Sequence, residues 1–471
     1  MENNEVKVEN KNRLEIWIYR LIYMYVILNP ILDIASYLTR NIFEINISPA
    51  TILRPIIPIF ICIYIFFKND LKYKMKMIGI SVIYGLYTIV HLYLFSKNIT
   101  GSSYGGLTHE LQYMINYTFM FLNIYIFTYL FRKKEQIGIL KKSVLISTII
   151  YIVSICIAII TNTSSYTYMY EQIGYKGWFE SGNSVSAILI LSMFVYIPLI
   201  KNKKYIKVII PLVVLTGIYL TMLIGTKTGM FGFFIVLGVI IVAQILLAII
   251  KKVKIDKKII LVLLIVTILS STLIGIIGSS TTKRREYIED EKSDVHLTGD
   301  LTNMKNSIEQ NTIEEGYLSN VQKQSILDLY NTANYMEIEN TDQRMQQLIY
   351  NVHLIKNQKD IMLVLFGNGF VLNFRELIME MEVPAILFNF GIIGAILYLG
   401  TFIYILGYGI ISFFKNIKKI DDEYILVLSG LAMAFALSTL TGYVFFNIST
   451  MTIIVILATI LMYNIRKIKE Y

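Results

Sequence analysis

The sequence predicts an all-α polytopic membrane protein with about twelve transmembrane helices and one long polar segment between the ninth and the tenth. Of its 471 residues, 55% are hydrophobic and only 16% are charged, and the mean hydropathy is +0.59. Apolar runs recur along the whole chain, and a helical run of about 18 residues or more spans roughly 30 Å of hydrocarbon. The runs are continuous, whereas the strands of a membrane β-barrel alternate between apolar and polar residues.

The chain divides into three parts: spans one to nine at residues 1–278, a polar segment at 279–382, and spans ten to twelve at 383–471. The individual spans are predicted at residues 16–38, 51–67, 77–95, 109–131, 143–161, 182–200, 208–224, 229–250, 259–278, 383–412, 424–440 and 444–464.

Basic residues alternate between the two ends of these spans. Counting from the N-terminus, every other connection is rich in Lys and Arg, and these seven hold 27 of them, against 5 in the five short connections at the other end. The positive-inside rule then places both termini in the cytoplasm and residues 279–382 outside the cell membrane. The net charge of +10 is spread over separate cytoplasmic patches beside the lipid, which argues against a nucleic-acid partner.

The outward segment is acidic, with 10 Lys+Arg against 17 Asp+Glu. Its apolar residues follow helical spacing in places, as in the run that starts at Arg344 in TDQRMQQ, so we expect two or more amphipathic helices over the outer face. Residues 361–379 carry too many polar residues and glycines to span, and a re-entrant or interfacial piece is expected there. A connection this long is usually functional.

Two cations at this outer face are candidates for binding an anion. Lys227 lies in GTKTG (225–229), where Thr226 or Thr228 can cap the next helix, so that free backbone N–H groups and an ammonium converge. The alternative is a lysine that snorkels from a tight turn. Arg344 lies in the first turn of its helix, capped by Asp342 or Thr341, where it opposes the helix dipole. It either binds an anionic ligand or is a solvated surface residue.

At three further places in the sequence, polar residues could have either a functional or a structural role. Glu380 and Glu382 precede the tenth span, and either could act as a general base or be a headgroup-level acid. Arg54 lies inside the second span, where a charge suggests function unless it forms a structural ion pair with Asp33. In GWFESGN (177–183), Glu180 and Asn183 could contact sugar or phosphate, whereas the aromatic residues fit the membrane interface.

Several other site classes find no support in the sequence. The four histidines are scattered, Cys62 and Cys156 lie inside apolar runs, and no metal-ligand spacing is present, so neither a metal nor a cofactor is predicted. FGNGF (366–370) holds only a G-x-G and follows no strand, so it is not a dinucleotide signature.

From about residue 170 to 460, the order of these motifs resembles the O-antigen ligase and polymerase superfamily. GTKTG between two spans, the long outward segment with its Arg-bearing helix, FGNGF, and an acidic stretch before FNFGIIGAILYLG carry the resemblance, and GWFESGN is similar to an element of Gram-positive members. The resemblance implies a GT-C-like, metal-independent, inverting glycosyltransferase. Its expected partners are an undecaprenyl-pyrophosphate-linked oligosaccharide, an acceptor glycan or lipid, and membrane lipid.

The resemblance also assigns roles by position. Lys227 falls where the family usually has Arg and would hold pyrophosphate, although Lys lacks the bidentate fork of Arg. Arg344 would contact the same group. The ligase branch has a His ahead of the tenth-span glycines, and this chain has Glu380 or Glu382 there. We favour polymerisation over ligation, because Gram-positive-type members lack the lipid A core that a ligase needs.

Two non-enzymatic readings compete with the transferase. A lipid-linked oligosaccharide flippase or polysaccharide transporter would be expected to carry mid-membrane charge and internal repeats, which are scarce here. A sensor would need a cytoplasmic signalling domain, and the cytoplasmic connections are too short for one.

Overall fold

The computed structural model describes residues 2–45, 48–98, 106–251, 257–291, 301–313, 318–338, 342–369, 377 and 379–470. The helices of the first part are α1 (Glu2–Asn41), α2 (Pro49–Lys68), α3 (Leu71–Asn98), α4 (Gly106–Leu130), α5 (Lys134–Ile160), α6 (Gly182–Tyr196) with a 3₁₀ extension (Ile197–Lys201), α7 (Lys203–Ile218) with a π-helical turn (Tyr219–Leu223), α8 (Lys227–Lys251) and α9 (Lys257–Ile277). The later helices are α10 (Ser280–Glu291), α11 (Leu301–Glu309), α12 (Asn320–Tyr335), α13 (Gln343–Gln358), α14 (Ile361–Phe366), α15 (Glu382–Lys415), α16 (Asp422–Leu440) and α17 (Ile448–Glu470).

Each predicted span coincides with a helix. Within the described residues, nine helical stretches are long and apolar enough to cross a membrane, and they lie in α1, α3, α5, α6, α7, α8, α15, α16 and α17. The other three predicted spans are helices α2, α4 and α9, which are not among those nine. The polytopic helical architecture is therefore confirmed, whereas the count of twelve stays a prediction.

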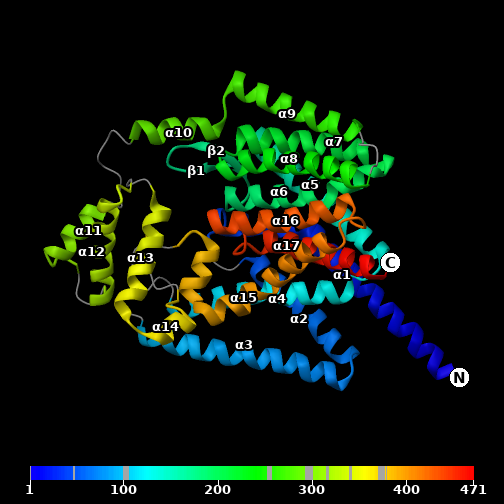
Figure 1. The fold of residues 1–471 in the computed structure, drawn as a ribbon, viewed down its shortest axis with the longest axis horizontal. Coiled ribbons are helices and arrows are strands. Elements are labelled where there is room, and N and C mark those ends of the chain that lie inside the picture. The colour runs from blue at the N-terminus through cyan, green and yellow to red at the C-terminus, as the bar shows by residue number, and fades with distance from the viewer. Residues whose placement is uncertain are drawn as a thin grey trace.

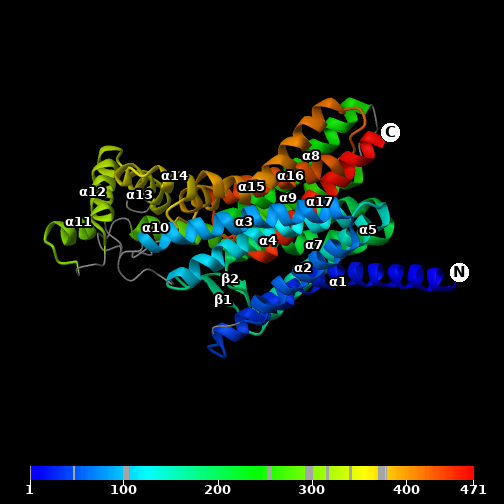
Figure 2. The same cartoon turned by 90° about the horizontal axis from the view of Figure 1, so that it is seen from below.

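The long helices lie side by side, and α10–α14 gather at one end of the bundle (Figures 1 and 2). Both chain termini lie at the opposite end. The expectation of several helices between the ninth and tenth predicted spans is thus met by α10–α14, of which α12 and α13 pack around their own small apolar core.

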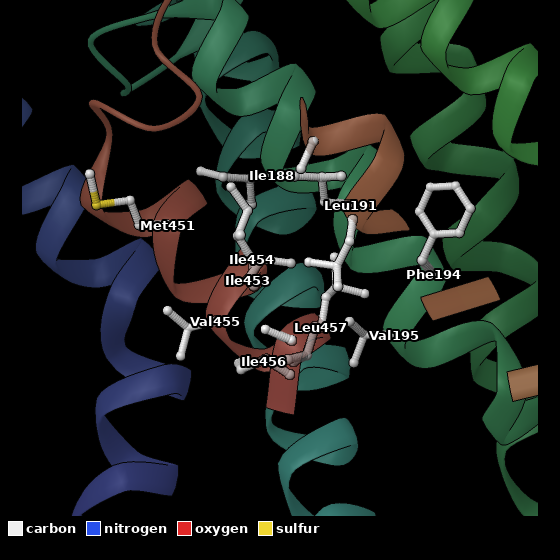
Figure 3. Close-up of a cluster of buried hydrophobic side chains, with 14 of the residues drawn as sticks. Ile188, Leu191, Phe194, Val195, Met451, Ile453, Ile454, Val455, Ile456 and Leu457 are labelled. Carbon is white, nitrogen blue, oxygen red and sulfur yellow. The ribbon is translucent and has the colours of Figure 1, made fainter. Parts of the chain in front are cut away.

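The centre of the bundle is formed by α6 and α17. In each, 83% of the apolar window is buried, against 17% in α3, which lies at the periphery. Figure 3 shows Ile188 and Leu191 of α6 beside Ile454 and Leu457 of α17. The large apolar side chains left exposed on peripheral helices suit a hydrocarbon surrounding, where they are solvated by lipid.

A small β-hairpin was not predicted. Strands β1 (Ser165–Tyr168) and β2 (Ile173–Gly177) pair antiparallel in the connection before α6. Gln172, Gly174 and Gly177 have positive φ, which is typical of the sharp turns that let so short a hairpin close. The hairpin lies at the same end of the molecule as α10 (Figure 1).

The tenth predicted span is also more complex than expected. Residues 383–412 were predicted as one continuous helix, but α15 is interrupted at Gly391, whose φ of 69° and ψ of −175° are not helical. Two backbone carbonyls just before this break accept hydrogen bonds from a neighbouring turn: Asn368 N donates to Phe388 O (3.1 Å), and Gly369 N donates to Asn389 O (2.8 Å). In the region where a re-entrant or interfacial piece was expected, the structure describes α14 and this turn, and most of residues 370–378 lie outside the described residues. The position of this region relative to the membrane stays a prediction.

Candidate functional site

The GTKTG turn follows the π-helical turn at the end of α7. Gly225 has φ +79°, and a Cβ added there would lie 3.2 Å from Ser280 Cβ and 3.6 Å from the Tyr168 ring, so the turn is pressed against α10 and the hairpin. Of the two threonines, Thr226 is the one that caps α8. Its Oγ1 accepts a hydrogen bond from Gly229 N (3.0 Å) and lies 2.8 Å from Ser186 Oγ. Lys227 is exposed, and no ion pair to it is found among the described residues.

Thr228, by contrast, is only partly buried and takes no part in the cap. The first turn of α8 thus presents Lys227 and Thr228 at the surface, while Thr226 is fully engaged inside. This is the geometry expected of a turn whose backbone is fixed and whose cation is available to a ligand.

Tyr168, at the end of β1, is the residue around which the cations gather. The guanidinium carbon of Arg284, in α10, lies 3.4 Å from the centre of its ring. Burial and the negative charge of Glu171 raise the pKa of the Tyr168 hydroxyl, and the positive charges of Arg284 and Arg344 oppose that rise. The structure therefore brings Arg344, the turn that carries Lys227, and Arg284 to one tyrosine.

Arg344 and Glu380 are also together, as an exposed ion pair of 3.3 Å. The position of Glu380 is fixed by its backbone, because its N–H donates to Gln347 Oε1 in α13 (2.9 Å). Asp342 caps α13 by accepting from Met345 N (3.3 Å), and the other cap candidate, Thr341, lies outside the described residues.

Glu382 has a different environment from Glu380. Its side chain is only 4% exposed, and its carboxylate accepts from the backbone N–H groups of Val444, Phe445 and Phe446 at 2.5–3.0 Å. These three residues belong to the connection between α16 and α17. Glu382 thus joins the start of α15 to that connection, and its oxygens are occupied by the backbone.

Arg54 lies in a separate, buried cluster. Its Nη2 donates to Asp33 Oδ1 (2.6 Å) and Ser449 Oγ (2.7 Å), and the Tyr151 hydroxyl donates to the other oxygen of Asp33. The structural ion pair, one of the two alternatives that the sequence left open, is therefore formed. A ligand role for Arg54 stays a prediction.

The GWFESGN connection lies next to the GTKTG turn. Gly182, at the start of α6, packs so closely that a Cβ there would meet Thr167 at 2.7 Å and Thr226 at 3.3 Å. Asn183, the next residue, is partly exposed. Glu180 pairs with Arg40 (2.9 Å), which gives it a structural partner at the surface.

Three features of this end were missed by the sequence reasoning. His91 and Glu110 form a buried pair (2.7 Å) between α3 and α4, and the Nδ1–H of His91 donates to Phe366 O (2.6 Å). Asn368 is buried, and neither atom of its amide has a hydrogen-bond partner within the described part of the chain. Arg284 is the third. The only sequence signal was the Arg pair directly after the ninth span.

No group of three or more His, Cys, Asp or Glu residues that could hold a metal is found among the described residues. The assembled side chains offer cations beside a carboxylate: Arg284 lies against Tyr168, Arg344 acts on the same tyrosine and pairs with Glu380, and Lys227 follows the Gly225 turn that packs near this ring. Such an arrangement can bind an oxygen-rich anion and accept a proton close to it.

Comparison with protein families shows which family the chain belongs to. The profile of the family described as O-antigen ligase like membrane protein matches residues 17–468. The protein belongs to the O-antigen ligase-like family. Comparisons with curated proteins and with solved structures give no match. Membership in this family implies glycosyltransferase activity on lipid-linked glycans in the synthesis of surface polysaccharide, and it covers nearly the whole chain, including every candidate residue above.

Proposed function

We propose that the protein transfers glycan from undecaprenyl pyrophosphate to an acceptor hydroxyl at the outer face of the cell membrane, and that it polymerises repeat units. The observation that carries this proposal is the gathering of Arg344 and the GTKTG turn around Tyr168, beside Glu380. A transferase whose leaving group is a pyrophosphate needs cations where the negative charge develops. The family supplies the substrate class.

The proposed step is an inverting displacement without a metal. The acceptor oxygen attacks the anomeric carbon, the bond from that carbon to the pyrophosphate oxygen breaks, and the pyrophosphate leaves on its lipid. Lys227 and Arg344 stabilise the charge that moves onto the leaving group, with Thr228 and Asn183 at the edge of the same surface. The proton of the acceptor hydroxyl passes to a carboxylate.

Glu380 is the better of the two carboxylates for this role. Its side chain is 47% exposed and lies beside Arg344, so it can reach an acceptor, whereas the oxygens of Glu382 are held by three backbone N–H groups. Glu382 then positions Glu380, two residues away, by fixing the start of α15. Thr226 contributes in a similar way, as the cap that orients Lys227.

The test uses purified protein in detergent with a short undecaprenyl-pyrophosphate-linked oligosaccharide and EDTA. We expect longer lipid-linked products and released undecaprenyl pyrophosphate. Lys227→Ala and Arg344→Ala should each lower kcat/KM by about 10²-fold, because each removes one preorganised charge at the leaving group. Lys251→Ala, at the far end of α8, and Lys356→Ala, at the far end of α13, are the matched controls and should retain activity.

The two carboxylates give a second comparison in the same assay. Glu380→Gln should lower kcat with little change in thermal stability, because the base is lost and only an exposed ion pair is removed. Glu382→Gln should lower thermal stability instead, because an amide N–H₂ would face backbone donors and leave buried groups unsatisfied, at about 1–3 kcal/mol. Full activity in Glu380→Gln would remove Glu380 from the mechanism.

Other outcomes separate the alternatives. Release of undecaprenyl pyrophosphate only after a distinct acceptor is added would identify a ligase. Movement of the donor across liposomes without any release would identify a lipid-linked oligosaccharide flippase and overturn the transferase proposal.

A further inference from the structure

Arg284 is a partly buried arginine with an aromatic contact but no ion-pair partner among the described residues. It lies one turn into α10, with its guanidinium carbon 3.4 Å from the centre of the Tyr168 ring. Its Nε is buried without a hydrogen-bond partner, and no carboxylate of the described residues forms an ion pair with it. By contrast, the preceding residue, Lys283, is exposed to solvent.

Stacking on an aromatic ring fixes the plane of a guanidinium but leaves the N–H groups along its edge to bind something else. A surface arginine without a function would be expected to reach water or a carboxylate. The guanidinium of Arg284 instead lies over the ring of Tyr168, where its buried Nε–H without a partner is unfavourable by about 1–3 kcal/mol. The arrangement is thus preorganised for an acceptor that the protein itself does not supply.

The surroundings of Arg284 indicate that this acceptor is an anion. Ser280, at the start of the same helix, abuts the Gly225 turn that leads to Lys227. Arg344 acts electrostatically on the same tyrosine from the side of α13. The positive charges of Arg284 and Arg344 act on this ring together with the negative charge of Glu171, and Glu380 neutralises part of the charge of Arg344. A ligand with two or more negative charges would interact favourably with both arginines.

Nearby hydroxyl groups fit the same ligand. Thr281 Oγ1, in α10, and Thr167 Oγ1, in β1, both lack a hydrogen-bond partner within the described structure, and the Thr281 side chain is only 9% exposed. A hydroxyl can donate to a phosphate oxygen as readily as to a carbonyl. Charge and hydrogen-bond donors therefore coincide at the junction of β1, α10 and the GTKTG turn.

Arg284 and Arg344 differ in how available they are. Arg344 is partly neutralised by Glu380 at 3.3 Å, whereas Arg284 has an aromatic ring in place of a carboxylate. The bidentate fork that Lys227 cannot offer is also present in Arg284.

We propose that Arg284 is a further binding residue for the diphosphate of the lipid-linked donor, held on Tyr168 as a platform and acting with Lys227 and Arg344. This inference rests on the proposed function for the identity of the donor. The binding of a diphosphate at Tyr168 can be tested separately.

The experiment measures two quantities in full-length protein: the KM for the undecaprenyl-pyrophosphate-linked oligosaccharide, and the shift in Tm caused by inorganic pyrophosphate. Arg284→Ala should raise the donor KM about tenfold or more, the usual effect of losing a hydrogen bond between charged partners, and should abolish the pyrophosphate-induced shift. Arg284→Lys should lie between wild type and Arg284→Ala, because it keeps the charge and loses the fork. Lys283→Ala, on the same helix, should match the wild type.

The outcomes distinguish this inference from the proposed function. If the wild type shows no transfer but pyrophosphate raises its Tm in an Arg284-dependent manner, the transferase proposal fails and the diphosphate site stands. If the wild type transfers glycan and Arg284→Ala and Arg284→Lys retain its KM and its pyrophosphate response, the inference about Arg284 is overturned. Should Arg284→Ala fold poorly, Arg284→Lys and Tyr168→Leu, which removes the platform, decide the question by the same two readouts.

Discussion

Gly391 adopts a backbone conformation that is essentially confined to glycine, with φ 69° and ψ −175°. A Cβ at this position would lie 2.5 Å from Gly367 N and from Leu365 O, which are backbone atoms and cannot be displaced by a side-chain rotation. The residue therefore fixes the break in α15 and the turn that docks against it. It also connects the FGNGF turn to the helix that begins at Glu382.

We expect Gly391→Ala to destabilise the protein by at least the ~1–3 kcal/mol of backbone strain, with a further contribution from the overlap with Gly367. Thermal unfolding in detergent measures the effect. Gly407→Ala is the matched control on the same helix, because no described atom beyond the adjacent turns of its own helix lies within 4 Å of the position its Cβ would take. An unchanged Tm for Gly391→Ala would contradict the described geometry of this break.

At the scale of single residues, the sequence predicted which kinds of residue lie at the site and which lie inside a span. It was less successful in predicting the residues that they contact. The Arg54–Asp33 pair could be anticipated because two opposite charges in neighbouring spans are unfavourable apart. The different environments of Glu380 and Glu382 could not, because the N–H groups around Glu382 come from residues 444–446, more than sixty positions away. Tyr168 and Arg284 were missed for the same reason: their meeting depends on a hairpin and on the direction of α10.

At the scale of elements, α12 and α13 pack around their own apolar core and share a hydrogen-bonded carboxylate. Asp328 of α12 accepts from Asn357 Nδ2 of α13 (2.8 Å) and from Gln324 Nε2 (2.9 Å). Burial alone would raise the pKa of the Asp328 carboxyl, but these hydrogen bonds and the nearby His353 outweigh it, so the pKa is lowered. The hydrogen bond to Asn357 connects α12 to α13, the helix that carries Arg344.

A pH dependence follows from that shift. Because the folded-state pKa of Asp328 lies below its unfolded value, its contribution to stability is present above about pH 4 and is lost as the pH falls through the folded-state pKa. Hydrogen exchange in α12 and α13, corrected for intrinsic rates, should therefore accelerate at low pH before that in α6 and α17. Asp328→Asn should reduce this pH dependence, whereas Glu309→Gln, at an exposed carboxylate of α11, should not.

Helices and strands could be predicted where they depend on the sequence of the segment itself and not on distant residues. Long apolar runs gave the helices of the bundle, and helical spacing gave α13, whose cap at Asp342 was also anticipated. The break in α15 depends instead on a turn at residues 367–369 that supplies hydrogen bonds from outside the helix. The hairpin β1–β2 is too short for alternation to identify it in a chain dominated by apolar runs.

At the scale of the whole molecule, the number of crossings and the position of the termini are connected. An even number of crossings returns a chain to the side on which it began. Both termini lie at the end opposite α10–α14 (Figure 1), which fits twelve crossings and not the nine helices that qualify by length and composition within the described residues. This favours one or all of α2, α4 and α9 as additional spans, as the alternation of basic connections predicts.

The same end of the bundle holds the basic connections, where Lys141 pairs with Glu423 (2.7 Å) and Lys68 with Glu15 (2.8 Å). The positive-inside rule predicts that this is the cytoplasmic end and that Tyr168 and the arginines near it lie outside. In that predicted orientation, a donor presented at the outer face could reach those cations, whereas a cytoplasmic sugar nucleotide could not. The orientation therefore decides which class of glycosyl donor the site can use.

Labelling of single cysteines in intact cells tests this orientation. In a protein with Cys62 and Cys156 replaced by Ala, Tyr335→Cys in α12, where the native side chain is 90% exposed, should react with a membrane-impermeant maleimide. Lys203→Cys, at the start of α7, should react only after the membrane is permeabilised. The reverse pattern would place the Tyr168 cluster in the cytoplasm, and a donor linked to undecaprenyl pyrophosphate at the outer face would then be excluded.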